Sequence, residues 1–418
     1  MKKNFEVTLK QMITVIHKTI NSVDKRLLNH GEQVAYIMFN LLKADGNYNE
    51  EEMLRLCAVS TFHDIGAYKV TELDKLTEID TVSPLNHAVY GSLFIKYFSP
   101  LSDLYNVVLN HHFSEKYAED NNIKSVCKEG ILLAFADYLD RLYLNNQQMN
   151  KSYIEEKCKD DYSNKYINLF FIANQKFNVI EKLKDGTYVK ELYEFFGQKI
   201  ITREEVIAYS KMLAYSIDFR SEATVKHTIT VEAISYQIAK LYGLDEEDLT
   251  RIKIAADLHD IGKIGIPVEI LEKQGKLTKE EFEIMQSHAI IGYNILSDLN
   301  IDDIRDIGTL HHEKLDGTGY PFGLKGNELT IEMRIVAIGD IISALLGSRS
   351  YKEEFDKDKI IKILKNMVQS NKIDSGIVTL FINNYDYIIE EAKKQWSDLM
   401  KIYLNLNNEY NEILESFV

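Results

Sequence analysis

Residues 257–264 read DLHDIGKI, and residues 61–68 read TFHDIGAY. Both stretches hold a histidine that is directly followed by aspartate, isoleucine and glycine. Imidazole nitrogen and carboxylate oxygen are ligands that divalent metal ions of the first transition row accept. Because this pair occurs twice with matching neighbours, the chain is predicted to hold two copies of one unit.

The histidines of the chain extend this repeat. Ten of the eleven fall into two sets, and each set runs in the same order: a lone histidine, the HD pair, another lone histidine, a pair of adjacent histidines and a later aspartate. The first set is His30, His63, Asp64, His87, His111, His112 and Asp137, and the second is His227, His259, Asp260, His288, His311, His312 and Asp340. The remaining histidine, His17, is expected to be a hydrogen-bonded core residue.

The rest of the chain has a helical pattern. Apolar residues recur at three- and four-residue spacing, as in 201–217 and 358–369, and only four prolines occur among 418 residues. We expect an all-α protein with two tandem helical-bundle domains, an N-terminal one at 1–200 and a second one at 201–375. A C-terminal helical tail is expected at 376–418.

The composition narrows the classes of partner. A net charge of -15 opposes binding to DNA or to an anionic membrane surface, so a phosphate ligand would need local cations. The three cysteines are far apart and are expected to be reduced thiols. We find no apolar run long enough to span a bilayer and no signal peptide, so a cytoplasmic location is expected.

Seven potential ligands in each set are more than one tetrahedral site needs. They suit two ions that share a bridging carboxylate, an arrangement that holds both the attacking and the leaving oxygen in phosphoryl transfer. The sequence therefore indicates metal-dependent phosphate chemistry.

Two stretches of the second set carry a family resemblance. HDIGKIGIP at 259–267, followed by HHEKLDGTGYP at 311–321, resembles the HD-GYP subgroup of the HD phosphohydrolase superfamily. The resemblance implies a helical bundle with an iron or manganese centre that hydrolyses cyclic dinucleotides. The leading expectation is cleavage of cyclic di-GMP to pGpG, and onward to GMP, by a metal-bound hydroxide.

The resemblance also implies a role for each matching residue. Lys263 would neutralise charge on the phosphoryl oxygens and would share the catalytic role with Asp260. Tyr320 and Pro321 would shape the nucleotide pocket, while Arg349 and Lys352 would grip phosphate. The implied metal ligands are His227, His259, Asp260, His288, His311, His312 and Asp340, with Asp260 as the bridge.

Some positions depart from the family pattern. Members with a third metal ion carry a glutamate where this chain has Ala223, with Glu222 one step away, so we expect two metal ions. Ser343 stands where relatives often have aspartate, and SRSY at 348–351 stands where RPY is usual. The contacts with substrate are expected to differ in detail.

The first set keeps all seven potential ligands but lacks the surrounding features. Ala67 replaces the lysine, and no GYP segment follows His112. We expect a regulatory or dimer-forming domain with a candidate second metal site at His30, His63, Asp64, His87, His111, His112 and Asp137. A second active site with another phosphate substrate and a metal-free relic remain open alternatives.

Other functions also remain open at this stage. The tandem layout of an HD unit and an HD-GYP unit also resembles enzymes that act on 3'3'-cyclic GMP-AMP. No residue of the sequence distinguishes guanine from adenine in the substrate. A sensor that binds the dinucleotide without hydrolysing it belongs to a different functional class. A general HD nucleotidase is the weaker alternative, because such an enzyme has no need of a GYP segment.

Overall fold

The structure is a computed structural model. It describes residues 6–21, 29–68, 85–121, 123, 126–145, 149–218, 222–273, 275–297, 301–347 and 355–416. No helix within these ranges is long and apolar enough to cross a membrane.

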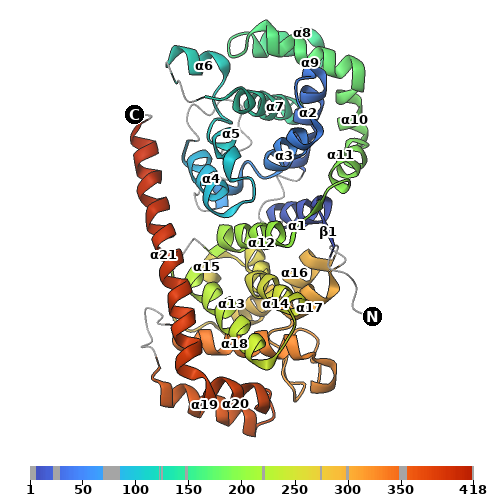
Figure 1. The fold of residues 1–418 in the computed structure, drawn as a ribbon. Coiled ribbons are helices and arrows are strands. Elements are labelled where there is room, and N and C mark those ends of the chain that lie inside the picture. Colours follow the sequence, from blue (N-terminus) through green and yellow to red (C-terminus); the bar gives the residue numbers. More distant parts are fainter. Residues whose placement is uncertain are drawn as a thin grey trace. The chain divides into compact units, whose positions relative to one another are not determined.

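The chain forms two compact units (Figure 1). The N-terminal unit consists of residues 6–201 and 406–418, and the C-terminal unit consists of residues 1–5 and 202–405. Within the stretch 376–418, expected as a C-terminal helical tail, residues up to 405 belong to the C-terminal unit and residues from 406 on to the N-terminal unit.

The N-terminal unit is almost entirely helical. Its two short strands, β1 (Val7–Thr8) and β2 (Ile200–Ile201), pair antiparallel with Val7 opposite Ile201. Its helices are α1 (Leu9–Asn21), α2 (His30–Asp45), α3 (Glu50–Thr61), η2 (Ile65–Tyr68), α4 (Leu85–Phe98), η4 (Ser102–Leu104), α5 (Tyr105–Leu109), α6 (Glu115–Asp120), α7 (Lys128–Asn145), α8 (Lys151–Cys158), α9 (Asn164–Phe177), α10 (Val179–Asp185) and α11 (Tyr188–Gly197).

The C-terminal unit is built from helices and connecting segments. Its helices are α12 (Arg203–Asp218), α13 (Glu222–Tyr242), α14 (Glu246–Leu258), η5 (Ile261–Gly265), α15 (Val268–Leu271), α16 (Lys279–Leu296), α17 (Asp302–Thr309), η7 (Gly326–Glu328), α18 (Ile331–Leu346), α19 (Lys357–Gln369), α20 (Ser375–Asn383) and α21 (Tyr385–Ser416), the last of which ends in the N-terminal unit. The all-α prediction is confirmed.

The ligand-bearing helices pack in the same way in both units. In the N-terminal unit, α2 packs against α3 and α7, and α4 packs against η2 and α5. In the C-terminal unit, α13 packs against α14 and α18, and α16 packs against η5 and α17 (Figure 1). The repeat seen in the sequence is therefore a repeat of the helical arrangement.

Local sequence defines where the ligand-bearing helices of the C-terminal unit begin. The side chain of Asp245 accepts hydrogen bonds from the first turn of α14, and Thr330 does the same for α18. Thr278 and Glu281 form a capping box at the start of α16. Each such cap contributes about 1 kcal/mol, because it satisfies amides that have no partner within the helix.

The glycine of the HDIG stretch lets η5 approach α16 closely. A Cβ atom on Gly262 would lie 1.9 Å from the carbonyl oxygen of His288 and 2.5 Å from the amide nitrogen of Gly292. In the N-terminal unit, a Cβ atom on Gly66 would lie 2.1 Å from the carbonyl oxygen of His87. This close approach brings the HD pair of each unit beside the next histidine of its set.

We predict that Gly262→Ala destabilises the C-terminal unit by roughly 1–3 kcal/mol, since an added methyl group must displace backbone atoms. Denaturant unfolding followed by circular dichroism measures this change. Gly347→Ala is the matched control, because the nearest atom to its Cβ would be 3.4 Å away. Equal unfolding midpoints for the two variants would contradict the role given to Gly262.

Candidate functional site

Five segments of the C-terminal unit bring the predicted ligands together. The lone histidines lie within α13 and α16, the HD pair follows α14, the adjacent histidines follow α17, and the later aspartate lies within α18. The residues are His227, His259, Asp260, His288, His311, His312 and Asp340. Helices distant in the sequence thus contribute to one site.

The candidate ligands form two groups. The His227 group consists of His227, His259 and Asp260, and the His288 group consists of His288, His311 and His312. Within each group, every residue offers a ligand atom within 4.8 Å of the others. This arrangement offers positions for two metal ions.

Asp260 lies between the two groups. Its Oδ2 atom is 3.1 Å from Nε2 of His259 and 3.7 Å from Nε2 of His227. Its Oδ1 atom is 3.4 Å from Nε2 of His288 and 4.0 Å from Nε2 of His311. Because each oxygen faces a different group, this carboxylate has the geometry of a bridge.

Asp340 reaches the same site from α18. Its Oδ1 atom lies 3.2 Å from Nε2 of His227. Burial alone would raise the pKa of Asp340, but hydrogen bonding and charge attraction from His227 lower it. The group is therefore a carboxylate at neutral pH and can add a ligand beside the His227 group.

Backbone carbonyls orient three of the imidazole rings. Nδ1 of His259 lies 2.7 Å from the backbone oxygen of Ala256. Nδ1 of His288 lies 2.6 Å from that of Met285, and Nδ1 of His311 lies 2.7 Å from that of Gly308. A carbonyl oxygen only accepts, so Nδ1 carries a proton in each ring. In neutral His288 and His311 the lone pair of Nε2 then points into the site, as metal ligation requires. Burial lowers the pKa of His259 but the charge of Asp260 raises it to about 9, so this ring has to release its Nε2 proton when a metal ion binds.

A serine orients the fourth ring. The Ser343 hydroxyl donates to the backbone oxygen of His227 at 3.1 Å, and its oxygen lies 3.0 Å from Nδ1 of the same residue. The hydroxyl oxygen is thus left to accept the Nδ1 proton. Ser343, predicted only as a departure from the family pattern, therefore directs Nε2 of His227 toward Asp260.

Two buried nitrogens of the site make no hydrogen bond with any part of the chain that the structure describes. These atoms are Nε2 of His288 and Nε2 of His311. Both face Asp260 Oδ1, which also only accepts, and a buried polar atom without a partner is costly. A cation between the nitrogens and the carboxylate would satisfy all three, so the residues fit a metal ion.

The protonation states also suit ligation in the His288 group. Burial lowers the pKa of His312 to about 4, and burial with repulsion from His312 lowers the pKa of His311 well below its usual value. Burial raises the pKa of Asp260, but His259 and Lys263 outweigh it and hold that pKa well below the usual range. Neutral imidazoles and a carboxylate are the ionisation states that bind divalent metals.

Lys263 lies at the edge of the site. Its ammonium group forms an ion pair with Oδ2 of Asp260, and its side chain is 19% exposed. The Asp260 side chain is 7% exposed, so the lysine is the more exposed partner of this ion pair. A ligand entering from solvent would meet it before the carboxylate.

The GYP segment covers the His288 group from one side. The Tyr320 ring lies 4.6 Å from the His312 ring, centre to centre, at an interplanar angle of 31°. Pro321 follows Tyr320 through a cis peptide bond. Tyr320 therefore lies next to a candidate ligand, and its tilted ring places an aromatic wall there.

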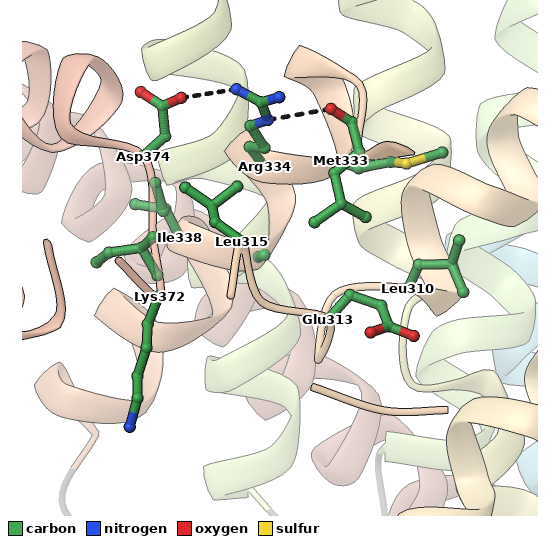
Figure 2. Close-up of a pocket in the computed structure, with 11 residues that line it drawn as sticks. Leu310, Glu313, Leu315, Met333, Arg334, Ile338, Lys372 and Asp374 are labelled. Atoms are coloured by element: carbon green, nitrogen blue, oxygen red, sulfur yellow. Dashed lines mark hydrogen bonds and ion pairs between the residues drawn. The ribbon is translucent and has the colours of Figure 1, made fainter. Parts of the chain in front are cut away.

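Glu313 holds the GYP segment in place, a role that was not predicted. Its carboxylate accepts hydrogen bonds from the backbone amides of Phe322, Gly323 and Leu324, at 2.7, 3.0 and 2.9 Å. Figure 2 shows Glu313 between Leu310 and Leu315 in a pocket whose far side holds the Arg334–Asp374 ion pair. The glutamate is visible in the HHE stretch of the sequence, but its hydrogen-bond donors lie nine to eleven residues later.

Some predicted positions lie outside what the structure describes. Arg349 and Lys352, predicted to grip phosphate, fall in 348–354, as does SRSY. The side chains of Glu222 and Ala223 are likewise not described. The prediction that a third metal site is absent therefore stays a prediction.

Comparison with known proteins identifies the family. The model of the HD domain family matches residues 27–142, and a further HD domain model matches residues 211–377. Residues 27–142 and 211–377 are therefore two HD domains in tandem. The predicted resemblance to HD phosphohydrolases is confirmed.

Two curated relatives and one solved structure are similar to the chain. A 3'3'-cGAMP-specific phosphodiesterase 1 of Vibrio cholerae is 26% identical over 422 residues, which cover 94% of this chain and 96% of the relative. A cyclic di-GMP phosphodiesterase of Thermotoga maritima is 38% identical over 221 residues, which cover 48% of this chain and 59% of that relative. The solved structure is a cyclic GMP-AMP specific phosphodiesterase of V. cholerae, which is 15% identical to this chain. The superposition covers 91% of this chain and 98% of the other chain with a TM-score of 0.56, which supports the fold.

We predict that Glu313→Gln loosens the GYP segment, because the amide group loses the charge and one acceptor oxygen that face three backbone donors. Loss of charge-assisted bonds of about 1.5–3 kcal/mol corresponds to amide exchange at Phe322, Gly323 and Leu324 that is roughly 10–100-fold faster. Hydrogen-exchange mass spectrometry measures this. Glu332→Gln, in the first turn of α18, is the control, and matching exchange rates in both variants would rule out the anchoring role.

Proposed function

We propose that the C-terminal unit is a cyclic dinucleotide phosphodiesterase that uses two divalent metal ions. The leading substrate is cyclic di-GMP, cleaved to pGpG and onward to GMP. The single observation that carries the proposal is Asp260, whose two oxygens face two separate histidine groups while Lys263 pairs with it at the exposed edge. Such a bridged pair suits phosphodiester hydrolysis, because attacking and leaving oxygens must both be stabilised.

The proposed ligands divide between the two ions. His227, His259 and Asp340 would hold one ion, His288, His311 and His312 would hold the other, and Asp260 would contact both. Mixed imidazole and carboxylate donors favour iron or manganese over hard cations that need oxygen ligands alone. When bound, such ions lower the pKa of coordinated water and polarise phosphoryl oxygens.

Lys263 is the proposed partner of the phosphate. Its ammonium group pairs with Asp260, and it is the more exposed member of the pair. Once Asp260 is bound to cations, the ammonium group is available to neutralise charge that develops on the phosphoryl oxygens. The proposed catalytic groups of this chain are thus Asp260, which organises the ions, and Lys263, which meets the substrate.

The GYP segment is the proposed nucleotide wall. The Tyr320 ring lies against His312, so it can contact a base or a phosphate beside the ligands, and Pro321 is proposed to shape the same wall from its position in the sequence. Glu313 keeps this segment in place by binding the amides of the three residues that follow it. Arg349 and Lys352 are proposed as further phosphate contacts from their positions in the sequence.

A second candidate substrate is 3'3'-cyclic GMP-AMP. The relative that matches the chain over nearly its full length, including both HD domains, is named for this dinucleotide. The relative named for cyclic di-GMP matches half of the chain at higher identity. Both substrates present the same phosphodiester ring, so the choice depends on contacts with one base.

We predict that the full chain, purified and loaded anaerobically with Mn(II) or Fe(II), linearises one of these two dinucleotides and leaves cyclic di-AMP intact. Asp260→Asn is expected to abolish turnover, because a neutral amide is a poor bridge between cations. Lys263→Gln is expected to lower kcat by roughly 10²–10³-fold with metal content unchanged. Chromatography of the products and elemental analysis of the same samples measure these effects.

The control for Lys263→Gln is Lys276→Gln, an exposed lysine of the same unit. It is expected to retain full activity. Tight dinucleotide binding by the metal-loaded chain without any linear product would instead favour a sensor that does not hydrolyse its ligand.

A further inference from the structure

We infer that the side chain of Phe322 is a stacking platform for one base of the bound dinucleotide. This role rests on the function proposed for the C-terminal unit, and it adds a substrate contact outside the metal ligands, Lys263 and the GYP tripeptide. Phe322 follows Pro321 directly and is 49% exposed. A nucleotide base has two flat faces, and aromatic side chains are the groups on which proteins stack such faces.

The backbone of Phe322 is fixed beside the turn that carries His312. The amide of Tyr320 donates to the carbonyl oxygen of His312 at 3.3 Å, and the amide of Phe322 donates to Oε1 of Glu313 at 2.7 Å. Gly319 permits this approach, because a Cβ atom there would lie 2.6 Å from the same His312 oxygen. Phe322 is therefore at most about 7 Å of chain away from Tyr320, whose ring lies against that ligand.

The side chain of Phe322 rests on the helix that carries His288. Its ring centre lies 5.1 Å from that of Tyr293 on α16, at an interplanar angle of 76°, which is the edge-to-face arrangement that aromatic pairs favour. Tyr293 follows His288 by five residues, which is about 7.5 Å along the helix axis. Phe322 thus contacts both elements that supply ligands to the His288 group, so a base beside those ligands lies within its reach.

Arg305 on α17 supports the Tyr293 ring. Its guanidinium carbon lies 4.2 Å from the centre of that ring, a distance at which a cation is attracted to the aromatic face. Two carboxylates hold the guanidinium in turn, since Nε lies 2.7 Å from Oδ1 of Asp306 and Nη1 lies 2.8 Å from Oδ1 of Asp302. The surface under Phe322 is therefore ordered before a ligand binds, which reduces the entropy that binding costs.

The contact with Tyr293 leaves part of the Phe322 ring accessible. In an edge-to-face pair a ring uses either its edge or one of its two faces, so Tyr293 covers at most one face of Phe322. Tyr293 is its only ring partner among the described residues, and nearly half of Phe322 is exposed. A base that stacks on the remaining face would remove apolar carbon from water.

The position of Phe322, and not its exposure alone, indicates a ligand. A single exposed aromatic residue is common on protein surfaces and needs no explanation. Tyr242 is also 49% exposed, but it ends α13, fifteen residues beyond His227 and about 22 Å along that helix. Tyr242 therefore serves as the control for Phe322.

Stacking on Phe322 supplies affinity without selecting a base. Every base has a π face, so the ring contributes equally to the binding of cyclic di-GMP and of 3'3'-cyclic GMP-AMP. Discrimination between guanine and adenine requires hydrogen bonds that this side chain cannot make.

Steady-state kinetics of the Mn(II)-loaded full chain test this role. Phe322→Ala is expected to raise KM for the hydrolysed dinucleotide roughly 5–150-fold with kcat nearly unchanged, because the lost stacking is made equally in the ground and transition states. The inhibition constant of inorganic phosphate, which has no base, is expected to stay at the wild-type value. Tyr242→Ala is expected to match the wild type in both measurements.

Two further variants separate stacking from packing. Phe322→Trp is expected to keep the KM of the wild type, whereas Phe322→Leu, which keeps an apolar side chain against Tyr293 but has no π face, is expected to resemble Phe322→Ala. A wild-type KM in Phe322→Ala or in Phe322→Leu would overturn the platform. Equal weakening of dinucleotide and inorganic phosphate in Phe322→Ala would also overturn it, because a general disturbance of the site would then explain the loss.

The wild type separates failure of this role from failure of the proposed function. Turnover of a dinucleotide by the wild type supports the proposed function, so an unchanged KM in Phe322→Ala then contradicts the platform alone. If the wild type binds a dinucleotide without turnover, the Kd from calorimetry replaces KM and the same ratios are expected. A metal-loaded wild type that neither binds nor hydrolyses a dinucleotide would contradict both.

Discussion

The carboxylate of Asp260 is the group on which the C-terminal site depends. Its two oxygens must face different histidine groups, so the segment after α14 has to lie against α16. Gly262 permits that approach because a side chain there would meet the backbone of His288. Burying a carboxylate among lone pairs opposes folding unless a cation balances it, so fold and ligand are energetically coupled.

Much of this arrangement could be predicted from the sequence. The repeated order of histidines and HD pairs predicted two helical domains, and the seven ligands that it singled out in each unit converge in space. The order of histidines and aspartates is informative because metal ligation restricts the types of residue at a site, and residue types can be read from a sequence.

The residues that orient the ligands could not be predicted in the same way. Ser343 acts through a hydrogen bond to a residue on another helix, and Glu313 acts on amides of a loop that follows it. In the N-terminal unit, Asp140 lies 2.7 Å from Nδ1 of His30 through its Oδ2 atom, and Arg141 pairs with Asp137. Both belong to α7, a helix whose sequence shows only an apolar pattern with charges. Hydrogen bonds of this kind require no particular spacing, so they became visible only in the folded chain.

The two units place a cation differently beside the same kind of donor set. The cation lies at the exposed edge in one unit and is buried against a terminal aspartate in the other. Hydrolysis requires a cation that reaches substrate, whereas stable ligation benefits from one that is locked in place.

The central claim is that Asp260 bridges two metal ions. Anomalous X-ray diffraction from crystals of the full chain grown with Mn(II) tests it most directly. The account predicts two peaks in the C-terminal unit, one at the His227 group and one at the His288 group, both in contact with the Asp260 carboxylate. A single peak, or two peaks with Asp260 bound only to Lys263, would contradict it.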